Sequence, residues 1–343
     1  MRYKLLGNSG LRVSEICLGT MSFGEDFGWG ISEPESRQIF DAFVEGGGNF
    51  IDTANEVYNG GSSEKFLGEF IATDRDRIVL STKYTDSLPT NDPNLAGNQR
   101  KNMVQSLERS LKRLKTDYID LFWLHSWDFV TPIEEIMRAF DDLVRSGKVL
   151  YIGIADAPAW VISRANTIAE LRGWTPFIAT QIEYNLVERT PERELLPMAQ
   201  KLNIGIVAWS VLASGILLKG KVNSQSLPEA VSLNKVGFGE LTNYEFAIAS
   251  LVQQIAQETG CTPAQVAINW VRSKGIIPIL GANKISQLQA DLACLDFQLS
   301  TEHLKALDDV STIELGFPHD FLAITKESTF GGMFNLIGDR PNN

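Results

Sequence analysis

Short apolar runs recur along the chain, and they constrain its fold more than any other feature of the sequence. Eight such runs, many of them rich in β-branched residues, lie at 16–19, 49–54, 78–83, 119–125, 149–156, 177–181, 204–210 and 276–281. Continuous rather than alternating hydrophobicity is typical of strands that are covered on both faces, as in a parallel sheet beneath helices. The runs therefore predict eight buried parallel strands.

Segments with the apolar spacing of helices lie between many of these runs. They cover 32–45, 98–114, 131–146, 192–202 and 244–259. Ser32 provides a helix-capping signal, and Gly46 and Gly147 follow two of the segments as stop signals. Eight strand–helix alternations favour a (β/α)8 TIM barrel over a doubly wound sheet, and no Gly-x-Gly-x-x-Gly follows the first run.

No low-complexity linker or internal repeat divides the chain, so we expect residues 1–343 to form a single α/β barrel domain. The opening residues 2–13 predict a short N-terminal β-hairpin that turns at Asn8-Ser9-Gly10 and closes the bottom of the barrel. The C-terminal tail, 317–334, is rich in aromatic residues, and we expect it on the substrate side of the barrel.

The charge balance and the cysteines exclude several classes of protein. A net charge of −11 and a pI near 4.9 argue against nucleic-acid or anionic-membrane partners, because both attract positive charge. None of the three cysteines has a metal-ligand spacing, so no metal site is expected. The chain shows no apolar signal segment and no stretch of about 18 apolar residues. We expect a soluble, cytoplasmic protein.

Three polar residues lie at or near the ends of successive apolar runs. They are Asp52, Lys83 and His125, and Tyr58 follows Asp52 in the next loop. The active sites of parallel barrels lie at the carboxyl ends of the strands, where the following loops converge. Each residue alone has an ordinary interpretation as a helix cap, a solvated charge, a packing aromatic or a core histidine. Their shared placement predicts that they meet in one site.

These four side chains suit proton transfer to a carbonyl oxygen. A neighbouring ammonium favours the phenolate, so we expect Lys83 to lower the pKa of Tyr58, with Asp52 holding Lys83 in place. His125 can donate a hydrogen bond to the same oxygen, which would polarise the carbonyl as hydride reaches its carbon. Such a site requires a hydride donor.

Several strings resemble the aldo-keto reductase family over essentially the whole chain. They include Asn49-Phe-Ile-Asp-Thr-Ala-Asn, Ser81-Thr-Lys, Leu121-Phe-Trp-Leu-His and Gly281-Ala-Asn-Lys. The strings Ser146-Gly-Lys-Val-Leu-Tyr-Ile-Gly and Gln181-Ile-Glu-Tyr-Asn are similar to its bacterial and fungal branch. The resemblance implies a barrel that carries NADPH or NADP⁺ across its mouth without a separate dinucleotide-binding domain.

The resemblance also implies roles for individual residues. The catalytic tetrad would be Asp52, Tyr58, Lys83 and His125. Asp156 and Gln181 would hold the nicotinamide carboxamide, and Trp209 would stack on the ring. The remaining cofactor contacts would come from Thr20, Met21, Asp52, Ser210, Leu212, Ser214, Gly215, Lys221, Gly281, Asn283, Lys284, Gln287 and Asp291. Besides the tail, an aromatic substrate pocket is expected from Phe23, Trp29 and Trp127.

Some positions depart from the family pattern. Tyr58 lies six residues after Asp52, one more than usual, so a bulge near Glu56 is needed to restore register. Ala155 replaces a common Ser, which removes one hydrogen bond worth about 1 kcal/mol. Asn283 stands where an Arg often meets the 2′-phosphate, which leaves NADH as the alternative cofactor, although Lys284 compensates in part.

Three functions follow from these observations. The first is an NADP(H)-dependent oxidoreductase that interconverts an aldehyde or ketone and its alcohol, with Tyr58 as general acid and base. The second is a cofactor-binding, redox-sensing subunit with little turnover, resembling the potassium-channel β-subunit, which the shifted Tyr58 would favour. The third, a cofactor-free isomerase or lyase, ranks lowest because no His/Asp metal cluster is present in the sequence. The natural substrate, the physiological direction and the oligomeric state do not follow from the sequence.

Overall fold

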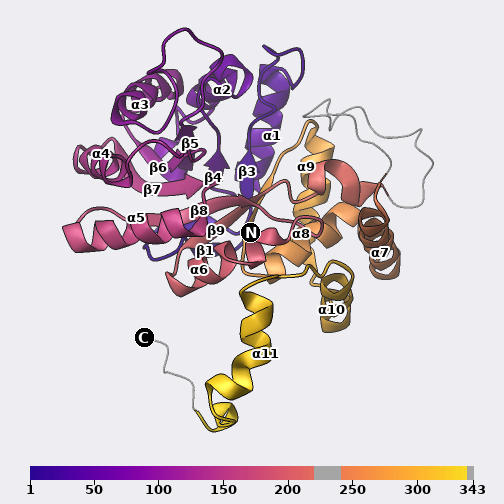
Figure 1. The fold of residues 1–343 in the computed structure, drawn as a ribbon. Helices are drawn as coiled ribbons and strands as arrows, with labels where there is room; N and C mark the ends of the chain where they lie inside the picture. The colour runs from indigo at the N-terminus through magenta and orange to yellow at the C-terminus, as the bar shows by residue number, and fades with distance from the viewer. Residues whose placement is uncertain (220–240, 338–343) are drawn as a thin grey trace.

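Eight parallel strands close into a barrel in a computed structural model that describes residues 1–219 and 241–337 (Figure 1). The strands are β3 (Cys17–Gly19), β4 (Phe50–Asp52), β5 (Val79–Tyr84), β6 (Ile119–Leu124), β7 (Val149–Ala155), β8 (Phe177–Glu183), β9 (Gly205–Trp209) and β10 (Ile277–Leu280). Each strand pairs in parallel with its neighbours in chain order, and β10 closes the ring against β3. All eight apolar runs are thus strands, and the predicted (β/α)8 barrel is confirmed.

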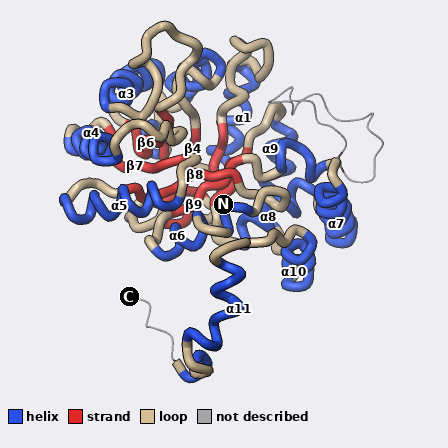
Figure 2. Tube along the Cα trace, in the orientation of Figure 1, coloured by secondary structure: helices blue, strands red, loops and turns tan. Residues whose placement is uncertain are grey.

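Helices surround the barrel and cover the outer faces of its strands (Figures 1 and 2). The helices that follow β3 and the later strands of the barrel are α1 (Glu33–Glu45), α2 (Ser62–Phe70), α3 (Arg100–Leu114), α4 (Ile133–Arg145), α5 (Ala159–Arg172), α6 (Leu195–Lys201), α7 (Asn243–Thr259), α8 (Pro263–Ser273), α9 (Ile285–Leu292) and α10 (Thr301–Val310). Ser32 and Glu35 form a reciprocal capping box at α1, which explains why this helix begins there.

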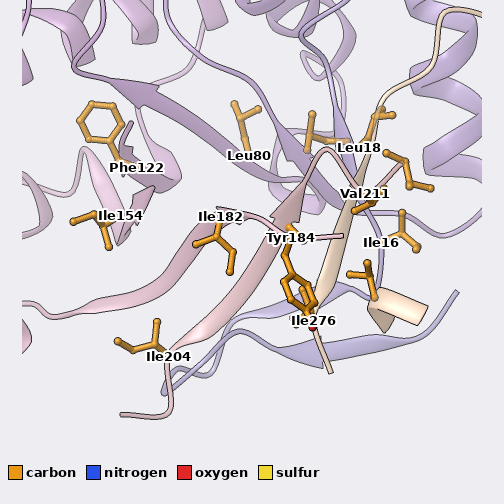
Figure 3. Packing of buried hydrophobic residues seen from close by; sticks show 14 of the residues in the cluster. Ile16, Leu18, Leu80, Phe122, Ile154, Ile182, Tyr184, Ile204, Val211 and Ile276 are labelled. Atoms are coloured by element: carbon orange, nitrogen blue, oxygen red, sulfur yellow. The ribbon is translucent and has the colours of Figure 1, made fainter. Parts of the chain in front are cut away.

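The hydrophobic core has two parts because the strands are buried on both faces. The larger cluster lies between the barrel and the helices, and Figure 3 shows part of it, with Leu80, Phe122 and Ile154 on successive strands. The smaller cluster fills the barrel interior and includes Phe50 and Trp123. This two-sided burial is the physical reason for the continuous apolar runs in the sequence.

The N-terminal hairpin, β1 (Tyr3–Leu5) and β2 (Arg12–Ser14), closes the bottom of the barrel as expected. Leu6 is fully buried and belongs to the interior cluster. At Gly7, which has φ +55°, a Cβ atom would lie 2.0 Å from the carbonyl oxygen of Ile178 and 2.6 Å from the amide nitrogen of Gly205. The hairpin therefore packs directly against the amino ends of β8 and β9, and the opposite end of the barrel forms the mouth.

The C-terminal tail does not lie where it was expected. Helix α11 (His319–Thr329) projects away from the barrel, and none of its residues is buried (Figures 1 and 2). Phe317 is 86% exposed and Phe321 56%, so neither ring is packed into an enclosed pocket. The structure therefore gives no support to an aromatic substrate pocket built from 317–334. Within 1–219 and 241–337, every helix is too short or too polar to cross a lipid bilayer.

Candidate active site

An ion pair at the mouth of the barrel forms the base of the candidate site. Lys83 on β5 has no exposed surface, and its ammonium contacts the carboxylate of Asp52 at the end of β4. Lys83 also donates to the carbonyl oxygen of Thr53 at 2.8 Å, and Asp52 Oδ1 accepts from Ser81 Oγ at 2.8 Å. Burial opposes the charge on Lys83, but the charge attraction and hydrogen bonds of Asp52 and Tyr58 together outweigh it, so the pKa of Lys83 lies above its usual value.

Tyr58 reaches this ion pair in spite of the extra residue in its loop. Its hydroxyl oxygen lies 3.4 Å from Lys83 Nζ. The loop turns at Asn55, whose backbone amide donates to the carbonyl oxygen of Lys83 at 3.3 Å and whose own carbonyl accepts from the amide of Tyr58 at 3.1 Å. Glu56 points outward, 3.4 Å from an Arg113 guanidinium nitrogen and 3.8 Å from one of Arg109. The loop therefore absorbs the extra residue.

The pKa of Tyr58 shifts in the direction opposite to the one expected from the sequence. Burial raises the pKa of the phenol above its usual value, and the positive charge of Lys83 offsets only part of the rise. The expectation of a net lowering neglected the cost of placing a phenolate in this poorly solvated position. Tyr58 therefore holds its proton at neutral pH, and Lys83 reduces the cost of losing it.

His125 follows β6 and faces the same space as Tyr58. The two rings lie edge to face with centroids 6.3 Å apart, and the amide of His125 donates to the carbonyl oxygen of Tyr84 at 3.0 Å. Burial, together with the nearby charge of Lys83, lowers the pKa of His125 to about 3. The imidazole is therefore neutral at physiological pH and carries one N–H. Its Nδ1 lies 3.1 Å from Oδ2 of Asp86, a residue that the sequence did not single out.

Three of the expected carboxamide and ring contacts come together at the ends of β7, β8 and β9. Gln181 donates from Nε2 to Asp52 Oδ1 at 3.1 Å, which leaves its amide oxygen for another partner. Trp209 donates from Nε1 to Asp156 Oδ1 at 3.1 Å. Asp156 has φ +43°, an unusual backbone conformation that places it just beyond the end of β7.

The loop after β9 has a backbone suited to an anion. Ser210, Ala213, Ser214 and Gly215 all have positive φ, from +49° to +88°. Leu212 between them has φ −98°, and turns that combine left-handed and right-handed residues can gather backbone N–H groups into a concave surface that binds phosphate. Leu212, Ser214 and Gly215 lie within this loop and its 3-10 turn. Lys221, the last residue expected on this side, lies outside the described residues.

The loop after β10 leads into the amino end of α9. Lys284 is the residue before this helix, and Asn283 donates its amide to Gln287 Oε1 at 3.2 Å. Gly281 precedes them in the loop. Asp291, on the last turn of α9, is buried, and this burial raises the pKa of its carboxyl to about 6. A helix amino end with an adjacent cation suits a phosphate group.

Two expected contact residues lie below the surface of the mouth. Thr20 is fully buried, and its hydroxyl donates to the carbonyl oxygen of Asp52 at 2.9 Å, so it supports the site rather than lining it. Phe23 is fully buried in the outer core with its ring 6.4 Å from that of Phe70. Neither residue has accessible surface in the structure, and their contacts with a ligand stay predictions. Met21 remains partly exposed.

The other two expected pocket residues retain accessible surface in loops at the mouth. Trp29 lies 6.5 Å from Phe27 in the loop after β3, and Trp127 lies 6.4 Å from Phe129 in the loop after β6. Phe27 and Phe129 are exposed. These rings give the rim an aromatic character on two of its sides.

Some residues of the site were not found from the sequence. Ser81 lies two positions before Lys83 on β5 and so shares its face, a signal that the period of two along a strand could have supplied. Glu64 on α2 is fully buried, accepts from Thr82 Oγ1 at 2.7 Å and pairs with Arg113 at 2.6 Å. Nothing in the local sequence marks Glu64 or Asp86, because their partners come from distant segments.

A parallel barrel with a buried carboxylate–ammonium pair, a phenol and an imidazole at its mouth defines a class of barrel enzymes with acid–base chemistry. The comparison with protein families makes this specific, since residues 15–312 match the model of the aldo/keto reductase family. The chain belongs to this family, whose members are oxidoreductases that use nicotinamide cofactors.

Several relatives are similar over almost the whole chain. A norsolorinic acid reductase of Aspergillus flavus is 37% identical over 95% of this chain and 85% of its own length. An aryl-alcohol dehydrogenase [NADP(+)] of Phanerodontia chrysosporium is 36% identical over 92% of this chain and 87% of its own. A putative aryl-alcohol dehydrogenase of Saccharomyces cerevisiae is 35% identical over 93% and 90%.

Proposed function

We propose that the protein is an NADP(H)-dependent oxidoreductase that interconverts an aldehyde or ketone and its alcohol, with Tyr58 as the general acid and base. The observation that carries the proposal is the 3.4 Å distance between the Tyr58 hydroxyl and an ammonium already paired with Asp52. A phenol beside a fixed cation can lose its proton to a substrate oxygen and regain it afterwards.

The residues present suit a nicotinamide dinucleotide across the mouth. The turn from Ser210 to Gly215, with four positive-φ residues, suits the pyrophosphate, and the start of α9 with Lys284 suits a phosphate at the adenosine end. The free amide oxygen of Gln181 suits the carboxamide, and the flat ring of Trp209 suits stacking. When bound, the reduced cofactor supplies the hydride.

The protein's own residues would handle the proton. In the reducing direction Tyr58 donates its O–H proton to the carbonyl oxygen, and the ammonium of Lys83 stabilises the phenolate that remains. Asp52 keeps Lys83 charged and in position. Neutral His125 has a single N–H, and it donates to the same oxygen only in the tautomer that carries the proton on Nε2 rather than on the Nδ1 that faces Asp86. In the oxidising direction the phenolate of Tyr58 accepts the alcohol proton.

Two observations support the finer assignments of cofactor and substrate. The printed name of the Phanerodontia relative specifies NADP(+), and Lys284 supplies a cation at the proposed phosphate position. Relatives named for aryl alcohols and for norsolorinic acid fit a rim that carries Trp29, Trp127 and Phe129. We propose aromatic aldehydes, ketones and alcohols as the substrate class, because offset or edge contacts with these rings would hold an aromatic ligand.

The test is the substitution Tyr58→Phe, which removes only the hydroxyl oxygen. Turnover with an aromatic aldehyde and NADPH should fall by about 10² to 10⁴-fold, the usual contribution of a positioned acid. Cofactor affinity, measured by quenching of protein fluorescence, should stay unchanged. Tyr3→Phe is the control, because Tyr3 is an exposed residue whose hydroxyl bonds to Gly47 far from the mouth. Undiminished turnover in Tyr58→Phe would refute the assignment.

The same assay measures the preference between NADPH and NADH and also tests the redox-sensing alternative. Loss of absorbance at 340 nm with NADPH and with NADH, run in parallel, gives the preference that Asn283 and Lys284 leave open. The redox-sensing alternative came from the resemblance to the potassium-channel β-subunit, and the shifted position of Tyr58 favoured it; the 3.4 Å distance between Tyr58 and Lys83 supports the enzyme instead. Multiple turnovers with simple aldehydes would exclude it.

A further inference from the structure

The C-terminal arm, residues 317–337, is not covered by the other residues that the structure describes. It leaves the barrel after α10, whose end is fixed where Arg189 Nη1 donates to Ser311 Oγ at 2.8 Å. At its base, Arg193 donates to the carbonyl oxygen of Glu314 at 2.9 Å, and His319 lies 3.2 Å from a carboxylate oxygen of Glu194. Beyond this point the arm extends away from the rest of the molecule (Figures 1 and 2).

The arm exposes a large apolar surface. Its large hydrophobic side chains that are classed as exposed are Phe317, Phe321, Leu322, Ile324, Phe330, Met333, Leu336 and Ile337. An aromatic side chain can bury about 150–250 Å², so this set offers on the order of 800 Å² in total, roughly the share of one partner in a standard protein interface. Contiguous exposed apolar surfaces of this size mark sites of association.

The short helix in the arm also indicates a partner, because it needs packing against another surface to be stable. Helix α11 has 11 residues, none of them buried. Isolated helices shorter than about 12–15 residues are marginal in water, because the cost of nucleation exceeds the gain from a few hydrogen bonds. The contacts inside the arm, such as the rings of Phe330 and Phe334 with centroids 5.0 Å apart, leave most of its apolar surface in water. Packing on another surface would supply the missing stabilisation.

The charges of the arm restrict the kind of partner. Its charged residues are Asp320, Lys326 and Glu327, so it has no surplus of cations. The whole chain has a net charge of −11. Binding to anionic lipid or nucleic acid depends on positive charge, so both are disfavoured.

We propose that the arm is a dimerisation element that packs on a second copy of this chain. Every copy carries the same arm, so a two-fold arrangement engages both arms at once and roughly doubles the buried area, to about 1,600 Å². A symmetric pair needs no partner other than the protein itself. This proposal does not depend on the proposed reaction.

The test compares two full-length variants with matched chemistry. Ile324→Glu places a charge in the arm, where Ile324 is 82% exposed. Leu171→Glu places the same charge on α5, where Leu171 is 79% exposed. Sedimentation equilibrium from about 1 to 100 µM measures the dissociation constant of the dimer. We expect Ile324→Glu to raise this constant at least about 30-fold, the effect of one central interface residue, while Leu171→Glu leaves it unchanged.

Hydrogen exchange of the wild-type protein gives a second readout. Amides of α11 should be protected at high protein concentration and lose their protection on dilution, because helix and interface form together. A wild-type protein that stays monomeric throughout the concentration range would overturn the proposal. So would a dimer that tolerates Ile324→Glu while the amides of α11 exchange freely, since another face would then hold the copies together.

Discussion

At Tyr58, burial and a neighbouring cation act on the same phenol in opposite directions. Burial raises its pKa, and Lys83 limits the rise. A phenol that stays protonated at neutral pH is ready to donate, and the fixed cation lowers the cost of the phenolate that follows. The balance could not be read from the sequence, because it depends on how deeply the hydroxyl is buried.

Asp291 provides a test of burial at a single carboxyl group. Its pKa of about 6 in the folded chain lies above the usual value for aspartate, near 3.9. The unfolded chain therefore releases the proton first, so the stability that this residue contributes is full below about pH 4 and is lost as the pH rises through 6. The total loss is at most about 3 kcal/mol.

Asp291→Asn removes this dependence. The variant should gain stability relative to the wild type on going from about pH 4 to pH 7, because only the wild type must bury a carboxylate at the higher pH. Urea unfolding of both proteins without cofactor, at the two pH values, measures the difference. A difference in unfolding free energy that is the same at both pH values would contradict this account.

The sequence located the catalytic candidates well because strand ends can be recognised from where apolar runs stop. Asp52, Lys83 and His125 follow from this rule, and the structure brings them to the same mouth as Tyr58. The sequence did not reveal that Phe23 is buried in the outer core, since the identity of an aromatic residue does not show which side of a loop it faces. Asp86 could be identified only from the folded structure, where it lies beside His125.

At the scale of elements, the loop from Asp52 to Tyr58 shows how an additional residue is accommodated. The turn at Asn55 keeps backbone hydrogen bonds to Lys83, and Glu56 is directed toward the arginines of α3. Arg113 in turn pairs with the buried Glu64. The loop that carries the phenol is thus fastened to both α2 and α3.

Glu56→Ala should loosen this loop without unfolding the protein. Partly exposed ion pairs contribute about 0–1 kcal/mol, so the melting temperature should change little. We expect the rate of carbonyl reduction to fall about tenfold, because small displacements of a reacting group are costly, while cofactor affinity is kept. Glu69→Ala, which breaks an exposed pair with Lys115, serves as the control in steady-state assays. Equal effects of the two substitutions would argue against a positioning role for Glu56.

Element boundaries were predictable where local signals are strong. The helix expected over 32–45 is observed at Glu33–Glu45, and its capping box is present. The helix expected over 192–202 is shorter, because Thr190–Glu192 form a 3-10 turn and α6 covers only Leu195–Lys201. The propensities of single residues do not separate such a turn from the helix that follows it.

At the scale of the whole molecule, closure of the barrel bottom depends on the hairpin. Leu6 fills the interior cluster, whereas its neighbour Leu5 is exposed. Leu6→Ala should lower the unfolding free energy by about 2–5 kcal/mol, the usual cost of a cavity in a packed core, and Leu5→Ala should lower it by much less. Denaturant unfolding of both variants measures the two changes. Equal losses would show that the hairpin does not stabilise the barrel through Leu6.

The barrel could be predicted because each strand is buried on both faces and therefore appears in the sequence as a continuous apolar run. The direction of the arm could not, because an apolar tail is compatible with packing on its own barrel mouth or on another surface. Its exposed residues, such as Phe317 and Ile324, have the composition of an interior segment. Only the three-dimensional arrangement shows that the residues described in the structure leave them exposed.

The order of the strands separates two tasks along the chain. The proposed proton-transfer residues, from Asp52 to His125, come from β4, β5, β6 and their loops, whereas most of the proposed dinucleotide contacts, from Asp156 to Asp291, follow β7 or later strands. The residues for proton transfer and the residues for cofactor binding would thus lie on opposite sides of the barrel. Substitutions among the cofactor-binding residues on one side could then change the cofactor preference during evolution, while Tyr58 on the other side is kept.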